Sequence, residues 1–168
     1  MDSKKALIKK CLIALVVGVV GLAGILIWAP KTHHHSIAFV CFAICATGFF
    51  VAGCVYFFTP KFLPYHQQAS DMDWEELTPQ SRGMALAVLR IVAGGFLCAS
   101  VATFILLWIP YRQGLVWAGP AIFVIYNSMA IPALYGTYLV ASNTPSNPPL
   151  LPVLTAIIIS FVGMILSF

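Results

Sequence analysis

Five long apolar runs occupy most of this chain and constrain its fold more than any other feature. They cover residues 11–28, 36–58, 84–109, 115–140 and 150–168. A helix needs about 20 mainly apolar residues to cross the ~30 Å hydrocarbon core of a bilayer, and each run is close to that length or exceeds it. The sequence therefore predicts an all-α fold, an integral membrane helical bundle with five transmembrane helices.

Composition indicates that lipid is the solvent for most of the surface. Of the 168 residues, 61% are hydrophobic and only 8% are charged, whereas soluble domains have about 25% charged residues. A chain this short exposes much of its area, and so few charges could not cover it in water. We therefore expect one transmembrane helical domain that comprises residues 1–168.

The first and last runs leave the number of spans open. Lysines precede run 11–28, but its apolar core is longer than the roughly 7–15 residues of a secretion signal, so we interpret it as a retained helix. Run 150–168 barely reaches the length that a span needs. Four spanning helices plus one peripheral helix are therefore the alternative to five.

Basic residues are distributed unequally between the two predicted sides, which indicates an orientation with the N-terminus inside. Trp28, Trp108 and Trp117 then lie at the outer interface, where aromatic residues are common. The sequence thus predicts a multi-pass protein of the cell inner (plasma) membrane with a cytoplasmic loop at 59–81, and it does not suggest a nucleic-acid partner. The inner side carries Lys4, Lys5, Lys9, Lys10, Lys61, Arg82 and Arg90, and the outer side carries Lys31 and Arg112.

The loop at 59–81 holds four of the five acidic residues of the chain. Ser70 is a plausible N-cap, and a short helix could run from it to Leu77 with acidic residues in its first turn, where they favour the helix dipole. Thr78 and Pro79 have the pattern of an N-cap and a first helical position. We interpret these acids mainly as helix starts in water.

Arg90 is the one charge within an apolar run, and it suggests a polar site. Asn127, Tyr135 and Tyr138 fall on one stripe of the following helix at helical spacing. Charged side chains inside a membrane usually face a bundle interior or a cavity. One hypothesis is therefore an inward-opening pocket in which these four residues bind a ligand, with Tyr65 and His66 as a lid.

The alternative to this pocket is ordinary hydrogen bonding between helices together with interfacial tyrosines, each bond contributing on average about 0.6 kcal/mol.

Neither a metal site nor a catalytic site has a clear sequence motif. His34, Cys41 and Cys45 share a face but have no fourth ligand. The chain has no G-x-S-x-G, H-E-x-x-H, P-loop or G-x-G-x-x-G motif. We therefore expect no metal site and no catalytic residue. The sequence indicates no particular cofactor and favours a protein that is not an enzyme.

Four segments, FTPKFLPYH, DWEELTPQSRG, LRIVAGGF and TPSNPPL, together resemble a family of small bacterial polytopic membrane proteins with no assigned activity. The resemblance covers roughly residues 50–150, and its PYH and TPxxPP pieces are the most distinctive. It implies a membrane location but no activity and no functional residues.

These features predict a non-enzymatic helical bundle that binds a lipid, a hydrophobic small molecule or partner membrane helices. The partners would be the bilayer itself and a second copy or another membrane subunit. One alternative is a small oligomeric channel or exporter. Another is a membrane oxidoreductase or transferase that uses His66 and Arg90.

Overall fold

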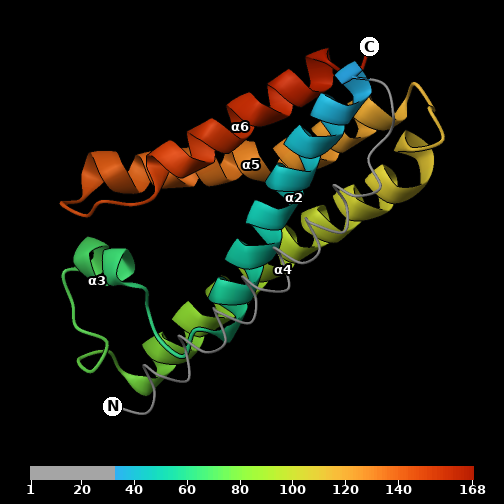
Figure 1. Ribbon diagram of the computed structural model, residues 1–168. Coiled ribbons are helices and arrows are strands. Elements are labelled where there is room, and N and C mark those ends of the chain that lie inside the picture. The colour runs from blue at the N-terminus through green and yellow to red at the C-terminus, as the bar shows by residue number, and fades with distance from the viewer. Residues whose placement is uncertain (1–32) are drawn as a thin grey trace.

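A computed structural model describes residues 33–168 of the chain, and this part consists of helices joined by short connections (Figure 1). No strand occurs among these residues, so the all-α prediction is confirmed for them. The elements in order are α2 (His33–Phe58), α3 (Pro64–Ser70), α4 (Pro79–Leu106), the π-helical turn η1 (Leu107–Tyr111), α5 (Ala118–Asn143) and α6 (Leu150–Ile165).

Three helical segments are long and apolar enough to cross a membrane, namely His35–Phe58, Pro79–Tyr111 and Ala118–Asn143. The helix α6 is apolar but has 16 residues, which is about 24 Å at 1.5 Å per residue and less than the ~30 Å core. Run 150–168 thus gives a shorter helix than expected. Run 11–28 lies outside the described residues, so five spans and the orientation stay predictions.

The helices form two pairs that meet at one end and diverge at the other (Figure 1). Helix α2 packs along α4, and α5 packs along α6, while α6 also contacts α2 and α4 also contacts α5. The pairs are closest where the chain ends, which we call the C-terminal end. They are farthest apart near α3, which we call the α3 end.

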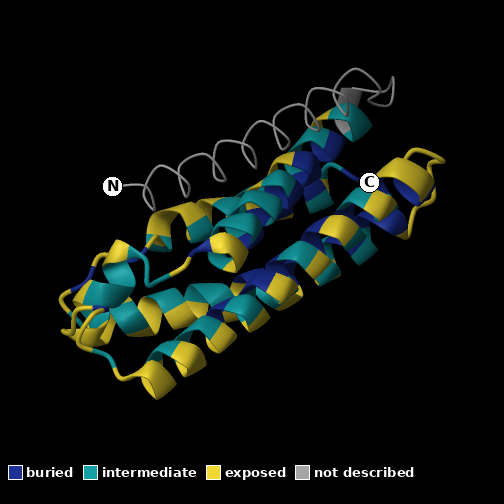
Figure 2. Cartoon of the chain, turned by 90° about the horizontal axis from the view of Figure 1, so that it is seen from below, coloured by how far each residue is buried: buried dark blue, intermediate teal, exposed yellow. Residues whose placement is uncertain are grey.

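Buried side chains lie between the helices, and the outward faces are exposed (Figure 2). At the C-terminal end the core includes Phe39, Phe42 and Ile122. Large apolar side chains such as Ile91 and Val124 are 75% and 64% exposed. Such an apolar outer surface would be costly in water but is well solvated by lipid.

The pair α2 and α4 is packed closely at Gly53. A Cβ at this position would lie 2.7 Å from Leu97 Cγ and 3.2 Å from the Ala93 carbonyl oxygen. The Ser100 hydroxyl also donates to the Ala46 carbonyl across the same interface, at 2.8 Å. Small residues let helix backbones approach in this way, which is a common basis of helix association in membranes.

Helix α4 continues into η1 instead of ending before Pro110, where the sequence indicates a connection. The Leu115 amide donates to the Pro110 carbonyl at 3.1 Å, five residues back. Gly114, at φ +74, then ends the segment in a left-handed conformation that suits glycine. The π turn directs Tyr111 into the core, where its hydroxyl contacts Ser167 and the His35 carbonyl.

The connection between α2 and α4 differs from the prediction in one respect and agrees in another. The short helix is α3, which begins at Pro64 and stops at Ser70, so the expected helix from Ser70 to Leu77 is wrong. The Ser70 hydroxyl bonds back to the Gln67 carbonyl instead of capping forward. The expected cap of α4 is confirmed, because Thr78 Oγ1 accepts the Ser81 amide at 3.2 Å.

Candidate functional site

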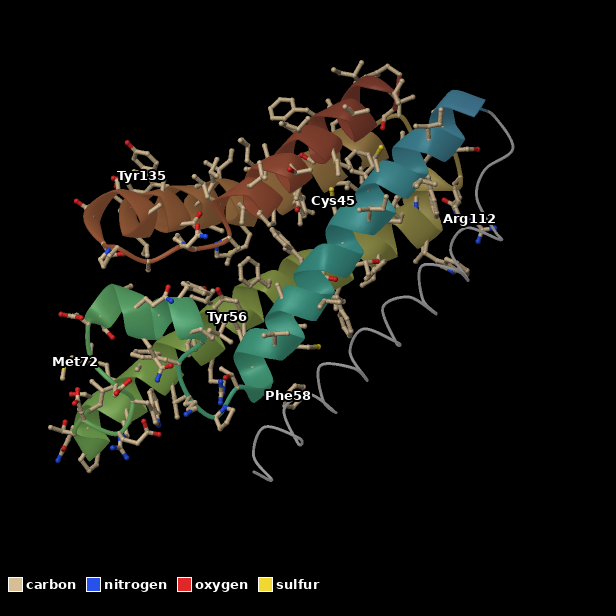
Figure 3. The ribbon with its side chains drawn as sticks, turned by 60° about the vertical axis from the view of Figure 1, so that its left-hand side comes forward. Cys45, Tyr56, Phe58, Met72, Arg112 and Tyr135 are labelled. Carbon is tan, nitrogen blue, oxygen red and sulfur yellow. The ribbon has the colours of Figure 1, made fainter. Side chains whose placement is uncertain are left out.

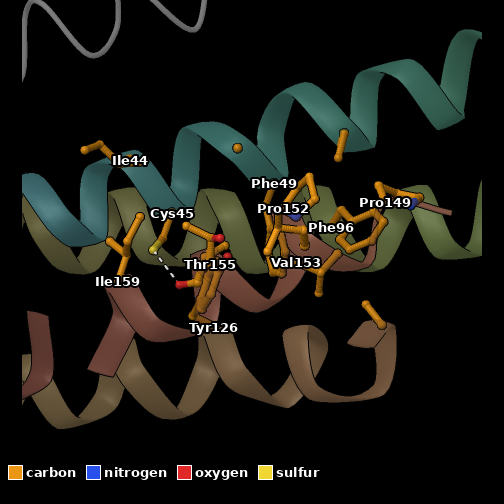
Figure 4. A pocket seen from close by; sticks show the side chains of 15 residues that line it. Ile44, Cys45, Phe49, Phe96, Tyr126, Pro149, Pro152, Val153, Thr155 and Ile159 are labelled. Atoms are coloured by element: carbon orange, nitrogen blue, oxygen red, sulfur yellow. Dashed lines mark hydrogen bonds between the residues drawn. The ribbon is translucent and has the colours of Figure 1, made fainter. Parts of the chain in front are cut away.

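An apolar slot of about 550 Å³ lies between α2 and α6, in the space left where the helix pairs diverge (Figure 4). We call it the α2–α6 slot. Its volume is within the range of about 300–1,000 Å³ that is usual for ligand pockets. Its walls include Cys45, Gly48 and Phe49 of α2, Phe96 of α4, Tyr126 of α5 and Val153 of α6.

Stacked aromatic rings form one wall of the slot. The rings of Phe49 and Tyr126 are stacked with centroids 4.3 Å apart, and Phe96 lies 4.9 Å from Phe49. The polar side chains that line the slot are those of Cys45, Tyr126 and Thr155, and the first two are bonded within the protein. The Cys45 thiol donates to the Ala156 carbonyl at 3.4 Å, and the Tyr126 hydroxyl interacts with the same thiol. The slot therefore presents mainly carbon to a ligand.

The slot runs along the bundle from its middle to the α3 end. Figure 4 shows Cys45 and Ile159 at one end and Phe96 and Pro149 at the other. At 1.5 Å per helical residue, Pro149 and Ile159 are about 15 Å apart along the axis. The slot therefore extends over about 15 Å, a length that suits an extended hydrocarbon chain.

Beyond the Pro149 end of the slot lies a cluster of rings that we call the α3 aromatic cluster. Tyr56 connects the two, because its ring centroid is 5.8 Å from that of Phe96. The hydroxyls of Tyr56 and Tyr65 form a hydrogen bond, and Figure 3 shows Tyr56 close to α3. The cluster consists of Tyr56, Phe62, Tyr65, His66 and Trp74.

Burial sets the protonation of the two α3 side chains in this cluster. His66 packs on Tyr65, Tyr56 and Phe62 at 4.0, 5.9 and 5.6 Å between ring centroids. This burial lowers the pKa of His66 below its ordinary value, and its Nδ1 atom is buried with no hydrogen-bond partner among the described residues. Burial and the hydrogen bond with Tyr56 raise the pKa of Tyr65. At neutral pH both groups are therefore uncharged.

We expect the docking of α3 to weaken as the pH falls. The pKa of His66 in the fold is below its ordinary value of 6.5, so the undocked segment binds a proton more readily than the docked one. The equilibrium constant for docking of α3 begins to decrease as the pH falls through about 6.5. Below that pH it can decrease by up to about tenfold per pH unit. Hydrogen-exchange protection factors of the α3 amides between about pH 7.5 and 5, corrected for the intrinsic rate, measure it.

The control for this prediction is His66→Phe, which keeps a ring but cannot titrate. Its α3 protection is expected to be independent of pH across the same range. A wild-type protein whose α3 protection does not change on acidification would contradict the prediction.

Arg90 binds backbone and does not face the slot. Its guanidinium donates from Nη1 to the Tyr56 carbonyl at 2.6 Å and from Nη2 to the Thr59 carbonyl at 2.7 Å. It also lies 5.7 Å from the ring centroid of Phe57. Arg90 therefore closes the C-terminal end of α2, where a cation is favoured by the helix dipole.

The three α5 residues of the expected pocket have different surroundings. Asn127 is buried, and its Nδ2 donates to Ser160 Oγ and to the Phe123 carbonyl, both at 2.9 Å. Tyr135 and Tyr138 are 62% and 55% exposed, and Figure 3 shows Tyr135 pointing away from α2 and α4. Both tyrosines border a shallow groove beside the start of α6.

The single pocket expected from the sequence is therefore not what the structure shows. Of the six candidate residues, Tyr65 and His66 lie together and Tyr135 and Tyr138 border one groove, while Arg90 and Asn127 each have other partners. Whether any of them binds a ligand stays a prediction. The apolar slot residues could not be predicted, because in sequence they look like any buried helix face. Gly48, next to Phe49, contributes to the open space because it has no side chain.

No family model, curated protein or solved structure matches this chain. The resemblance to small bacterial membrane proteins therefore stays an expectation. Among the side chains that the structure describes, no group of three or more His, Cys, Asp or Glu residues could hold a metal ion.

Proposed function

We propose that this chain is a membrane protein that binds the apolar chain of a lipid or hydrophobic small molecule in the α2–α6 slot, without catalysing a reaction. The observation that carries the proposal is the slot itself. Its length of about 15 Å equals half of the ~30 Å hydrocarbon core, the depth of one leaflet. One hydrocarbon chain from one leaflet would fit along it.

Binding in the slot would depend on packing more than on the hydrophobic effect. Lipid tails are as apolar as the slot, so leaving the bilayer brings no transfer free energy. If the slot were empty, the wall atoms of Phe49, Phe96 and Tyr126 would lack dispersion contacts on the side that faces the slot. A chain that fills the slot restores those contacts, and the rigid rings would favour it over a disordered tail.

The proposal includes a topology. We propose five spans with the N-terminus inside, in the cell inner (plasma) membrane, and hence the α3 end on the cytoplasmic side. Lys61, Arg82 and Arg90 belong to the α3 end, and Arg112, near Trp108, belongs to the other. This imbalance is the one expected for a cytoplasmic α3 end. The slot would then take its chain from the cytoplasmic leaflet.

The direct test uses a phospholipid with a diazirine at the middle of one acyl chain, incorporated in nanodiscs with the full chain. After irradiation, mass spectrometry maps the labelled peptides. We expect labelling concentrated on the slot walls, such as Cys45 and Val153, above that of the outward face around Ile91. Uniform labelling of all apolar faces would show ordinary solvation by lipid and would reject the proposal.

The decisive variant is Gly48→Leu, which is expected to lower labelling of the slot about tenfold. Gly48 lines the slot, and a Cβ there meets nothing within 4 Å, so a leucine can be introduced at this position and take up part of the slot. About 1.4 kcal/mol of lost contacts corresponds to that factor. The matched control is Gly94→Leu on α4, which is exposed, has the same open space and does not line the slot. Equal labelling of both variants would contradict the prediction.

A further inference from the structure

We infer that the ligand of the α2–α6 slot carries one uncharged carbonyl group part-way along its apolar chain, and that the Thr155 hydroxyl donates a hydrogen bond to this group. The inference rests on the proposed binding function and adds the chemical class of the ligand. Three observations carry it: the unused hydroxyl of Thr155, its depth in the bundle, and the absence of charge from the described walls of the slot.

The Thr155 hydroxyl has no hydrogen bond within the part of the chain that the structure describes. Thr155 belongs to α6, is exposed and lines the slot. Other helical threonines donate to their own backbone. Thr47 of α2 donates to the Ala43 carbonyl at 2.8 Å, and Thr137 of α5 donates to the Ala133 carbonyl at the same distance. The Thr155 proton is therefore available to a ligand in the slot.

The two other polar side chains of the slot have already used their protons. The Cys45 thiol donates to the Ala156 carbonyl at 3.4 Å, so the Tyr126 hydroxyl is the donor in its contact with the same sulfur. Thr155 directly precedes Ala156 and so lies within about 1.5 Å of the same level along α6 (Figure 4). At this level Thr155 supplies the available donor. A carbonyl needs one donor and brings no proton of its own, so it matches this wall.

Thr155 lies near the middle of the bundle, at a depth where a bilayer holds no water. The hydrogen bond from Asn127 Nδ2 to Ser160 Oγ brings α5 and α6 to one level. Because α6 runs antiparallel to α5 (Figure 1), Thr155, five residues before Ser160, is level with about Pro132. The midpoint of α5 (Ala118–Asn143) is about 2 Å from that level. A hydroxyl at this depth must find its partner in the protein or in a ligand.

No charged side chain lines the slot within the described part of the chain. An unpaired charge near the middle of a bilayer is costly, so an uncharged group suits the slot. A carbonyl in the surrounding hydrocarbon has no hydrogen-bond donor, and the slot offers one. Thr155 is about 9 Å from Pro149 along α6, so the carbonyl would lie part-way along the chain. The chemical class is therefore an apolar chain with a ketone near its middle, in a lipid or in a free molecule.

The test compares two phosphatidylcholine probes in nanodiscs that contain the full chain. Both have the same diazirine on the same carbon near the end of one acyl chain, and one of them also has a ketone near the middle of that chain. We expect the ketone probe to label the slot walls about threefold more than the plain probe. This is the factor that an average side-chain hydrogen bond in a membrane gives.

The decisive variant is Thr155→Val, which removes the hydroxyl and keeps the branched shape of the side chain. It is expected to abolish the preference for the ketone probe and to leave labelling by the plain probe unchanged. Thr155→Ser keeps a hydroxyl and should retain the preference. The matched control is Thr47→Val, which removes a hydroxyl that is bonded to its own helix and does not line the slot. This control should retain the threefold preference.

Equal labelling of the slot by both probes, still lowered by Gly48→Leu, would overturn the carbonyl inference and leave the binding function standing. A preference that survives Thr155→Val would overturn the inference as well. If neither probe labels the slot above the outward faces, the proposed function fails together with the inference.

A second pair of probes with the same two chains but no headgroup distinguishes the sources of the ligand. A ketone preference that is larger in this pair would support the inference and assign the slot to a free molecule. A larger preference in the phosphatidylcholine pair would support it and assign the slot to a membrane lipid.

Discussion

Replacing Arg90 with methionine is expected to lower the thermal unfolding midpoint in nanodiscs by about 10 °C. The guanidinium makes two short hydrogen bonds to the carbonyls of Tyr56 and Thr59. Thr59 is 1% exposed, so water cannot easily replace Arg90 as the hydrogen-bond donor to its carbonyl. A hydrogen bond to a charged group contributes about 1.5–3 kcal/mol, so about 3 kcal/mol is lost. For a chain of this size that corresponds to the stated shift.

The matched variant for this prediction is Arg90→Lys. A lysine keeps the cation near the α2 carbonyls but has one ammonium in place of a planar fork with two parallel donors. We expect it to recover about half of the lost midpoint. An Arg90→Met protein with an unchanged midpoint would show that the arginine only extends toward the interface and does not hold α2 to α4.

A second large effect is expected at Gly53, where leucine should destabilise the fold by about 3 kcal/mol. The new Cβ would meet Leu97 Cγ at 2.7 Å and the Ala93 carbonyl oxygen at 3.2 Å. The leucine side chain can rotate away, but the carbonyl belongs to the α4 backbone. The two helices would therefore have to move apart near Gly53, which weakens the close packing of α2 on α4 there.

Gly94→Leu again serves as the control, now for stability. Both glycines lie inside a helix, where leucine is intrinsically better than glycine by roughly 0.8 kcal/mol. At Gly94 a Cβ meets nothing within 4 Å, so only this gain applies. The two substitutions should shift the unfolding midpoint in opposite directions. A shift of the same sign and size in both would mean that α2 and α4 are not in close contact at Gly53.

Local signals in the sequence predicted the parts of the fold that local chemistry decides. Apolar run length identified the helices, and the pair Thr78–Pro79 marked the start of α4, because a cap needs only its own neighbours. The position of α3 was missed. Ser70 is acceptable both as an N-cap and as a final helical residue, and only Asp71, at φ +49, shows which role it has.

The site was harder to predict because it depends on which helix faces which. Asn127, Tyr135 and Tyr138 do share a stripe of α5, but α6 covers Asn127 and leaves both tyrosines exposed. Arg90 was expected to share a pocket with those tyrosines, and its partners are carbonyls at the end of α2 instead. Hydropathy cannot distinguish these outcomes, since all faces of such helices are apolar.

The π turn at Leu107–Tyr111 makes the chain sensitive to its length at this one place. A π turn holds one more residue than an α turn for the same advance, as if a residue had been inserted. Inserting a further residue there would exceed what one wide turn can hold and would rotate Tyr111 by about 100° about the helix axis. Tyr111 would then leave the core that it shares with His35 and Ser167. An insertion of one residue would thus do more harm here than in the exposed loop around Met72, where no helix phase has to be kept.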